Sequence, residues 1–550
     1  MPSLTTPHCY RIFKEPQLSR FTSIPDIYDW NFHNNPDYPV FTYQNDQGRR
    51  LFASYGAVVP AAHKAAFHVS NTLGLDISAD RGSYPTVALL TTADTVTTYT
   101  TLIGMLHLGL LVFPISPRFS PQVIAHLLEK SNATAVLVSD DWLHGLASNA
   151  IDILMNSGSK HRISGVFFLP QYTDLYESSS IIKFLPKKEM NTETPALLVH
   201  TSCSTSQYPK VIAWTVGMNF QQARGPATGT RELVGKVLGC FAIEPFHGIG
   251  LLLLFWMPST GITMGTFRPR SPAVVPKPDA EWSTDNTKID FLAKMQGVLS
   301  GGKAIRKAAG DLLASRGVSL RNMYGSTESG HLSAVPSPHL DRDWEYFTLH
   351  QQCKVEFDPI GDGSFHAIVL PSVTHDPPSL NTMFGENQAY ATGDLFFPHP
   401  HKPGYWKFFG RMDARIMLSS GLVVNASHIE EHICEHEDIL AAVVFGYARP
   451  RLGVIIHLKS DCPFAPEEAQ LKRDKIWPHI EKMNKCNLAK YSCIAKEMII
   501  FTQPGKPFPY SQKGAPRRPA VIIDYQAEID ALYGSPMLDP LFFRGASLKT

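Results

Sequence analysis

The chain has few cysteines, and none of them are paired in a motif. Eight are scattered through 550 residues without a CxxC pair, at Cys9, Cys203, Cys240, Cys353, Cys434, Cys462, Cys486 and Cys493. This spacing argues against a structural zinc site and against a dense disulfide framework. We therefore expect reduced thiols, as in a cytoplasmic protein.

An excess of charge of either sign is also missing. The chain carries 50 basic and 49 acidic side chains, which gives a formal net charge of +1. No global field therefore attracts nucleic acid or an anionic membrane surface. We expect the partner to be a small molecule, and neither nucleic acid nor a membrane.

Long apolar runs are absent as well. Residues 1–15 contain His, Arg, Lys and two prolines where a secretory signal has its apolar core, so we expect no export. Two apolar stretches, Leu102–Ile115 and Gly248–Met257, are shorter than the roughly 20 residues of a membrane-spanning helix. Both are predicted to be elements of the core.

What the sequence does contain is a regular alternation from residue 84 onward. Helix-like stretches such as Pro121–Ser131 separate short apolar runs that are typical of strands. The runs are Val87–Leu90, Leu111–Pro114, Ala135–Val138, Gly165–Leu169 and Ala196–Val199. This pattern predicts an α/β fold with βαβ units and sheets covered by helices.

A domain boundary is expected near residue 412. The length exceeds the size at which a single core stops growing, so at least two domains are expected. Prolines at 398, 400 and 403 interrupt the chain, and a new pattern of short strands and helices begins after Arg411. We predict a large domain over residues 1–412 and a small α+β domain over residues 413–550.

Two segments have the composition of phosphate and metal sites. Residues 197–210 form a strand that runs into a loop rich in Ser and Thr and ends at Lys210. Hydroxyls and backbone N–H groups in such a loop can hold phosphate oxygens, although a single loop of this kind is usually an ordinary turn. Residues 322–330 place Tyr324, which can stack on a base, close to Glu328, which can hold magnesium.

Two later segments carry ionic side chains. Asp394 ends a strand-like run and can accept hydrogen bonds from ribose hydroxyls, and Arg411 can reach a sugar or a phosphate. Lys513 lies on a basic loop near the C-terminus. Taken alone, each of these segments could be an ordinary solvated loop without a functional role.

In this order, the four segments resemble the signature loops of the adenylate-forming superfamily, which includes acyl-CoA ligases, luciferases and the adenylation domains of peptide synthetases. Flanking stretches at Ile24–Trp30, Phe113–Arg118 and Glu528–Tyr533 are similar to fungal synthetase-like reductases. The resemblance implies an adenylation unit with a large N-terminal domain and a small mobile C-terminal domain. It implies that ATP and Mg²⁺ activate a small carboxylic acid as an acyl-adenylate, with release of pyrophosphate. The acceptor that follows is expected to be CoA or the phosphopantetheine thiol of a carrier protein.

The resemblance also assigns roles to individual residues. The catalytic residues are expected to be Lys513, His247 and Thr327. Asp413 would be the hinge and Glu328 the magnesium ligand. The nucleotide would be held by Thr201, Ser202, Ser204, Thr205, Lys210, Gly301, Gly302, Tyr324, Gly325, Ser326, Asp394 and Arg411.

The sequence departs from the family pattern at two places. Cys203 and Ser206 occupy expected glycine positions of the phosphate loop, where glycine allows close approach to phosphate. Near Pro278–Ala280 the chain is shorter than expected by about one helix and one strand. These departures keep a second hypothesis open, in which the protein binds nucleotide but has lost turnover.

A third hypothesis is a zinc hydrolase. His428, Glu431 and His432 match an H-x-x-E-H pattern. The alternative for this segment is the solvated face of an amphipathic helix, because the pattern recurs by accident.

Overall fold

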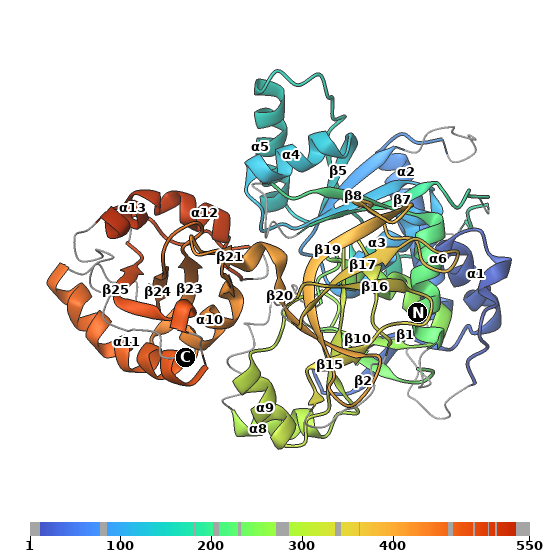
Figure 1. Ribbon diagram of the computed structural model, residues 1–550. Coiled ribbons are helices and arrows are strands. Elements are labelled where there is room, and N and C mark those ends of the chain that lie inside the picture. The colour runs from blue at the N-terminus through green and yellow to red at the C-terminus, as the bar shows by residue number, and fades with distance from the viewer. Residues whose placement is uncertain are drawn as a thin grey trace, which may run out of the picture.

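A computed structural model describes residues 12–534 apart from short gaps. The gaps are 77–84, 180–182, 187, 202–207, 229–232, 242, 271–284, 336–342, 362, 460–465, 488–489, 504 and 512–513. The shortened segment near Pro278–Ala280 lies outside the described residues. Figure 1 shows a large body, coloured blue to yellow, beside a smaller orange and red one.

The large body contains a six-stranded sheet in the order β6-β5-β3-β4-β7-β8. Its strands are β3 (Thr86–Leu90), β4 (Leu111–Ile115), β5 (Ala133–Val138), β6 (Val166–Phe168), β7 (Pro195–His200) and β8 (Val211–Thr215). All neighbouring strands are parallel except β7 and β8. The predicted strands and the α/β class are confirmed.

Helices cover both faces of this sheet. The four helices are α2 (Tyr55–Thr72), α3 (Thr95–His107), α4 (Pro121–Lys130) and α5 (Asp141–Asn156). Successive side chains of a strand point to opposite faces. Val87 and Leu89 of β3 therefore belong to the core formed with α2 and α3, whereas Ala88 and Leu90 belong to the core formed with α4 and α5.

Helix α7 (Gly248–Thr260) is the central buried helix of the large body. It includes the apolar stretch Gly248–Met257, so the prediction of a core element there is confirmed. Three buried tyrosines donate hydrogen bonds to its carbonyls: Tyr28 to Leu254 at 3.0 Å, Tyr55 to Met257 at 2.9 Å and Tyr99 to Gly250 at 2.8 Å. The tyrosines come from α1 (Ile24–Asn34), α2 and α3, so these bonds join four helices.

A second sheet has the order β2-β1-β10-β9. Its strands are β1 (Pro39–Gln44), β2 (Arg50–Ser54), β9 (Val237–Gly239) and β10 (Thr263–Gly265). A parallel pair, β11 (Val298–Gly301) and β12 (Leu320–Met323), lies beside α8 (Asn286–Ala293) and α9 (Lys307–Ser315). Helix α6 (Val216–Arg224) follows β8 and packs on α7.

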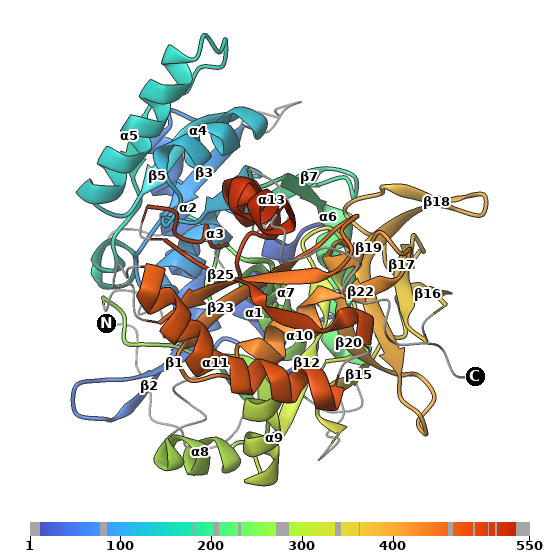
Figure 2. The same cartoon turned by 60° about the vertical axis from the view of Figure 1, so that its left-hand side comes forward.

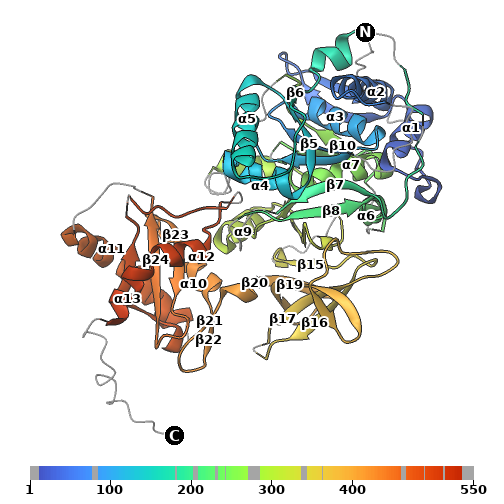
Figure 3. The ribbon, with the colours of Figure 1, turned by 90° about the horizontal axis from the view of Figure 1, so that it is seen from above.

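The third sheet of the large body is antiparallel. Its strands are β15 (Tyr346–Thr348), β16 (Lys354–Pro359), β17 (Phe365–Leu370), β18 (Thr382–Phe384), β19 (Asn387–Pro398) and β20 (Tyr405–Arg411). Strand β20 leads from this sheet toward the small body (Figure 3). The register of β19 and β20 places Asp394 directly opposite Arg411.

The small body has its own core, built from buried residues between Ile416 and Ile529. Its strands are β21 (Arg415–Met417), β22 (Val423–Asn425), β23 (Ile439–Phe445), β24 (Leu452–Leu458) and β25 (Ile494–Phe501). Its helices are α10 (Ala426–Ile433), α11 (Pro466–Asn487), α12 (Arg518–Asp524) and α13 (Gln526–Gly534), several of which are labelled in Figure 2. In the part of the chain that the structure describes, every helix is too short or too polar to span a lipid bilayer.

Candidate active site

A cleft of about 2250 Å³ opens in the large body. Segments that are far apart in the sequence line it, among them the start of α7, the end of β11 and the hairpin that follows β12. Seven of the predicted site residues face this cleft: His247, Gly301, Gly302, Tyr324, Gly325, Ser326 and Thr327.

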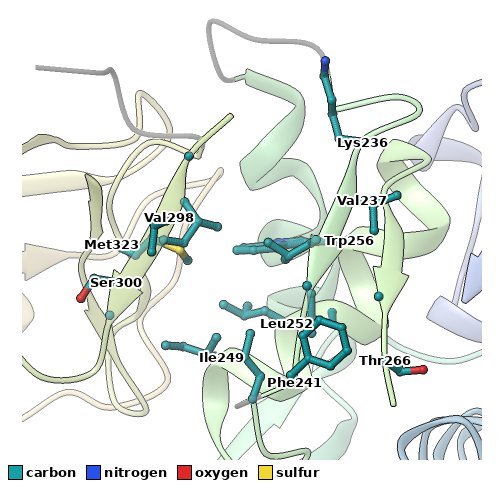
Figure 4. A pocket seen from close by; sticks show the side chains of 18 of the residues that line it. Lys236, Val237, Phe241, Ile249, Leu252, Trp256, Thr266, Val298, Ser300 and Met323 are labelled. Carbon is teal, nitrogen blue, oxygen red and sulfur yellow. The ribbon is translucent and has the colours of Figure 1, made fainter. Parts of the chain in front are cut away.

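One part of the cleft is an apolar slot between α7 and the β11–β12 pair. Ile249, Leu252 and Trp256 have the i, i+3, i+7 spacing that places side chains on one helix face. Figure 4 shows these three side chains directed toward Val298 and Met323 across the slot. None of the five side chains carries a charge.

Tyr324 forms the first link of a polar network beside the cleft. Its hydroxyl donates to Asp394 Oδ2 at 2.7 Å, and its ring stacks on Phe347 with centroids 5.4 Å apart. Burial and the neighbouring Asp394 carboxylate raise the pKa of Tyr324, so the hydroxyl stays protonated and remains a donor.

Asp394 and Arg411 form the second link. Arg411 Nη1 lies 2.9 Å from Asp394 Oδ1 and also donates to the Thr392 carbonyl at 3.1 Å. Burial raises the pKa of Asp394, although the Arg411 charge and the Tyr324 hydrogen bond oppose that rise. Neither residue lines the cleft itself, but through Tyr324 the ion pair lies next to it, and such a pair can present oxygen and nitrogen atoms to a sugar.

Arg411 also reaches the predicted hinge. Its Nε atom lies 3.3 Å from Asp413 Oδ1, and Asp413 belongs to a single 3₁₀ turn (Met412–Ala414) between β20 and β21. The same guanidinium group therefore contacts a residue of the third sheet and a residue of the connection to the small body.

A short hairpin carries the hydroxyls that face the cleft. Strands β13 (Gly325–Ser326) and β14 (Gly330–His331) approach so closely that a Cβ atom on Gly325 would lie 2.5 Å from the Gly330 carbonyl oxygen, which requires glycine there. Trp214 Nε1 donates to the Thr327 carbonyl at 3.0 Å and holds the turn. The neighbouring Glu328 is half-buried and is not among the described residues that line the cleft.

The base of the predicted phosphate loop is closed by hydrogen bonds. Thr201 N donates to the Lys210 carbonyl at 3.0 Å, and Lys210 N donates to Thr201 Oγ1 at 3.0 Å. Between them, Ser202, Cys203, Ser204, Thr205 and Ser206 lie outside the described residues. The structure therefore places only the two ends of this loop.

His200, at the end of β7, is a cleft residue that the sequence interpretation did not single out. Its Nε2 accepts the Ser116 N–H at 3.2 Å, so Nδ1 carries the hydrogen and donates to the Thr201 carbonyl at 3.2 Å. Burial lowers the pKa of His200 to about 3, which keeps the ring neutral. The available signal was a histidine that ends an otherwise apolar strand.

Glu244 and Arg118 were missed as well: Glu244 contacts His247, and Arg118 pairs with Glu244. No local pattern pointed to Glu244, and its partner Arg118 follows β4, which is distant in the sequence. Lys513 lies outside the described residues. Of the residues on either side of it, Ser511 N donates to the Ala515 carbonyl at 2.8 Å.

Among the described residues, the zinc hypothesis finds no third ligand. His428 and His432 on α10 meet edge to face with ring centroids 4.6 Å apart, but the one group with metal-ligand spacing in this part of the chain is Asp29, His63 and His107. In that group His63 Nδ1 accepts the Leu185 N–H, so Nε2 carries a hydrogen and donates to Asp29 at 3.1 Å. The His63 nitrogen that would hold a metal is therefore already occupied by a proton.

Comparison with known proteins agrees with this geometry. Residues 28–282 match the model of the AMP-binding enzyme family, and residues 413–536 match the model of the AMP-binding enzyme C-terminal domain. Together the two matches cover more than half of the chain.

Two fungal relatives align with nearly the whole chain. Adenylate-forming reductase Nps10 of Heterobasidion annosum is 35% identical over 97% of this chain and 51% of its own length. Adenylate-forming reductase Nps11 of Serpula lacrymans is 27% identical over 92% of this chain and 49% of its own length. The chain thus spans about half the length of these relatives.

The fold is shared with solved structures of low sequence identity. The anthranilate CoA ligase AuaEII in complex with anthranoyl-AMP superposes with a TM-score of 0.65 at 15% identity, covering 94% of this chain and 99% of the ligase. With the family matches and the fungal relatives, this likeness leads to one conclusion: the chain belongs to the AMP-binding, adenylate-forming enzyme family and is similar to the fungal synthetase-like members.

Proposed function

We propose that the protein uses ATP to convert a carboxylic acid into an acyl-adenylate and pyrophosphate. The observation that carries this proposal is the network of Tyr324, Asp394 and Arg411 beside the cleft. It joins an aromatic ring, a carboxylate and a guanidinium group, the side chains suited to a base, a ribose and a phosphate. The names of the adenylate-forming relatives support the same reaction.

The nucleotide would lie along the polar side of the cleft. Gly302 has a positive φ of 79°, a conformation that favours glycine, and because glycine has no Cβ the adenine could approach its backbone closely. Tyr324 would stack on the base. Asp394 and Arg411 would hold the ribose. Lys210 and the hydroxyls of residues 201–205 would bind the phosphates.

We propose that Thr327 and Glu328, on the β13–β14 hairpin, hold magnesium, although only Thr327 lines the cleft. Thr327 faces the cleft and is followed by the Glu328 carboxylate, and hard oxygen ligands of this kind suit Mg²⁺. When bound, the ion would neutralise charge on the phosphate oxygens.

The chemistry needs positioning and charge stabilisation rather than a general base. An ordinary carboxylic acid is already ionised at neutral pH, so one of its oxygens can attack the α-phosphorus directly. The bond to the β-phosphate oxygen breaks, and pyrophosphate leaves with the electron pair. His247 and Lys513 would stabilise the negative charge that accumulates in the transition state.

The acyl group would occupy the slot between α7 and the β11–β12 pair. Its uncharged lining of Ile249, Leu252, Trp256, Val298 and Met323 favours an apolar acyl group over a charged one, because an unpaired charge is costly in such surroundings. We propose an apolar carboxylic acid as the substrate class.

We further propose that residues 1–412 and 413–550 are separate domains, with Asp413 as the hinge. The family match that begins at residue 413 and the separate core of Ile416–Ile529 support this division. Rotation at the hinge would bring Lys513 to the α-phosphate for adenylation and later admit a thiol acceptor. The acceptor would be CoA or the phosphopantetheine of a carrier protein.

The proposal is tested by acid-dependent exchange between ATP and radiolabelled pyrophosphate across a panel of carboxylic acids. At least one apolar acid should support exchange, and Lys513→Ala should lower the rate by about 100-fold or more while AMP binding changes little. Lys490→Ala, an exposed lysine of the small body, is the matched control and should exchange like the wild type.

The alternative is a nucleotide-binding relative without turnover, motivated by Cys203 and Ser206 in the phosphate loop. It predicts AMP binding without exchange for any acid, in the wild type and in the Lys513 variant alike. A Lys513 variant that exchanges as fast as the wild type would remove this lysine from the mechanism.

A further inference from the structure

We propose that Glu244, neutralised by Arg118, is a positioning residue that fixes the imidazole of His247 at the cleft. This inference rests on the proposed acid activation, in which His247 acts beside the reacting groups. Glu244 lines the cleft next to His247 and would act through His247 rather than on the reacting atoms.

The geometry converges on one carboxylate oxygen. Glu244 Oε2 lies 3.2 Å from His247 Nε2 and 2.5 Å from Arg118 Nη2. The Glu244 side chain is 20% exposed and the His247 side chain 26%, so this contact is shielded more than a typical surface ion pair. Arg118 approaches from the loop after β4 and lies over the Phe246 ring, with Cζ 5.7 Å from the ring centroid.

The backbone holds Glu244 and His247 in a fixed relation. His247 N donates to the Glu244 carbonyl at 3.2 Å, and His247 is the N-cap residue of α7. A Cβ atom on Gly250 would lie 2.1 Å from the Glu244 carbonyl oxygen, so Glu244 is seated directly on the first turn of the helix. Movement of the Glu244 backbone would therefore require movement of α7.

The 3.2 Å contact with Glu244 selects the tautomer of His247. A carboxylate can only accept, so Nε2 carries the hydrogen that points at Glu244. Nδ1 is then the ring nitrogen left for a ligand in the cleft. Without Glu244, the imidazole ring would be free to rotate, and either ring nitrogen could carry the hydrogen or face the cleft.

Arg118 neutralises the negative charge that Glu244 brings to the cleft. Burial alone would raise the pKa of Glu244, but the His247 hydrogen bond and the Arg118 charge lower it, so the carboxylate is ionised. A bare carboxylate beside the cleft would repel the substrate carboxylate and the phosphates. Paired with Arg118, it orients His247 without adding net negative charge.

A purely structural ion pair is the competing explanation. Removing such a pair would lower stability and would affect activity in the same way whether or not His247 is present. A positioning role predicts instead that the effect of removing Glu244 depends on His247, because the two residues act as one unit.

The experiment is a double-mutant cycle in the full chain. Glu244→Gln, His247→Ala and the double variant are compared for kcat and KM in pyrophosphate exchange with the best apolar acid. Glu244→Gln should lower kcat about tenfold with little change in the KM for ATP, and should have no further effect in the His247→Ala background. Arg118→Gln should also lower kcat. Glu356→Gln, which replaces an exposed glutamate on β16, should leave kcat unchanged.

A spectroscopic measurement makes the inference independent of turnover. In ¹⁵N–¹H spectra, His247 should show the Nε2–H tautomer in the wild type and a mixture of tautomers in Glu244→Gln, with the melting temperature of the variant close to that of the wild type. If no acid supports exchange, the proposed function fails, and these spectra still decide the link to His247. Additive effects in the cycle, or an unchanged tautomer, would overturn the assignment of Glu244.

Discussion

At the scale of single residues, the candidate site depends on charged groups that satisfy one another before any ligand binds. Asp394 accepts from the Tyr324 hydroxyl and pairs with Arg411, and it is almost completely buried. A ribose that approaches this site meets a carboxylate held in one orientation. The side chain therefore does not have to lose rotational freedom when the nucleotide binds.

Replacement of Asp394 tests the ribose assignment. Asp394→Ala should weaken AMP binding by about 10- to 100-fold, because hydrogen bonds to a charged group contribute roughly 1.5–3 kcal/mol each. Isothermal titration calorimetry with AMP measures the effect. Glu356→Ala, an exposed residue of the same sheet, is the control. Equal AMP affinity in the Asp394 variant and the wild type would refute the assignment.

At the scale of elements, helix α7 connects the core to the cleft. Its carbonyls accept from three buried tyrosines, its N-cap is His247, and one of its faces lines the apolar slot. A small displacement of this helix would therefore change packing and site geometry together.

Two helical glycines provide a matched pair of substitutions. Gly250→Ala should lower the free energy of unfolding by about 1–3 kcal/mol, because the new methyl group would collide with the Glu244 carbonyl. A methyl group on Gly145 in α5 would meet no atom within 4 Å, so Gly145→Ala should raise the free energy of unfolding by about 0.5–1 kcal/mol. Urea denaturation measures both values, and a stable Gly250→Ala protein would contradict the tight seating of α7.

At the scale of the whole molecule, buried neutral histidines link stability to pH. Burial lowers the pKa of His200 and His331 to about 3, and that of His107 and His375 to about 4. In the unfolded chain a histidine has a pKa of about 6.5. Between about pH 6.5 and pH 4 the unfolded state therefore binds more protons than the folded state, and stability rises with pH in this window.

This linkage predicts a steep loss of stability on acidification. The free energy of unfolding should fall between pH 6.5 and pH 4, by up to about 1.4 kcal/mol per pH unit for each fully buried histidine. His107→Leu should make the dependence shallower by about one proton, whereas His401→Asn, at an exposed position, should leave it unchanged. Denaturant titrations at several pH values test this, and an unaltered slope in His107→Leu would contradict it.

The sequence by itself determined the class of the fold and the family. Apolar runs such as Val87–Leu90 and Leu111–Pro114 are long enough and regular enough to predict buried parallel strands, because hydrophobic periodicity is a local property of the chain. The motifs around Tyr324, Asp394 and Arg411 were recognisable because they are short and contiguous.

Only the tertiary structure decided which of these groups touch one another. Asp394 meets Arg411 because the register of β19 and β20 places them opposite each other, and Arg118 reaches Glu244 because the loop after β4 packs beside the segment that precedes α7. No local pattern encodes such contacts, because they depend on how separate elements pack. For the same reason His200 and Glu244 were not found in the sequence, although His200 accepts from Ser116 N and Glu244 accepts from Arg118 in the fold.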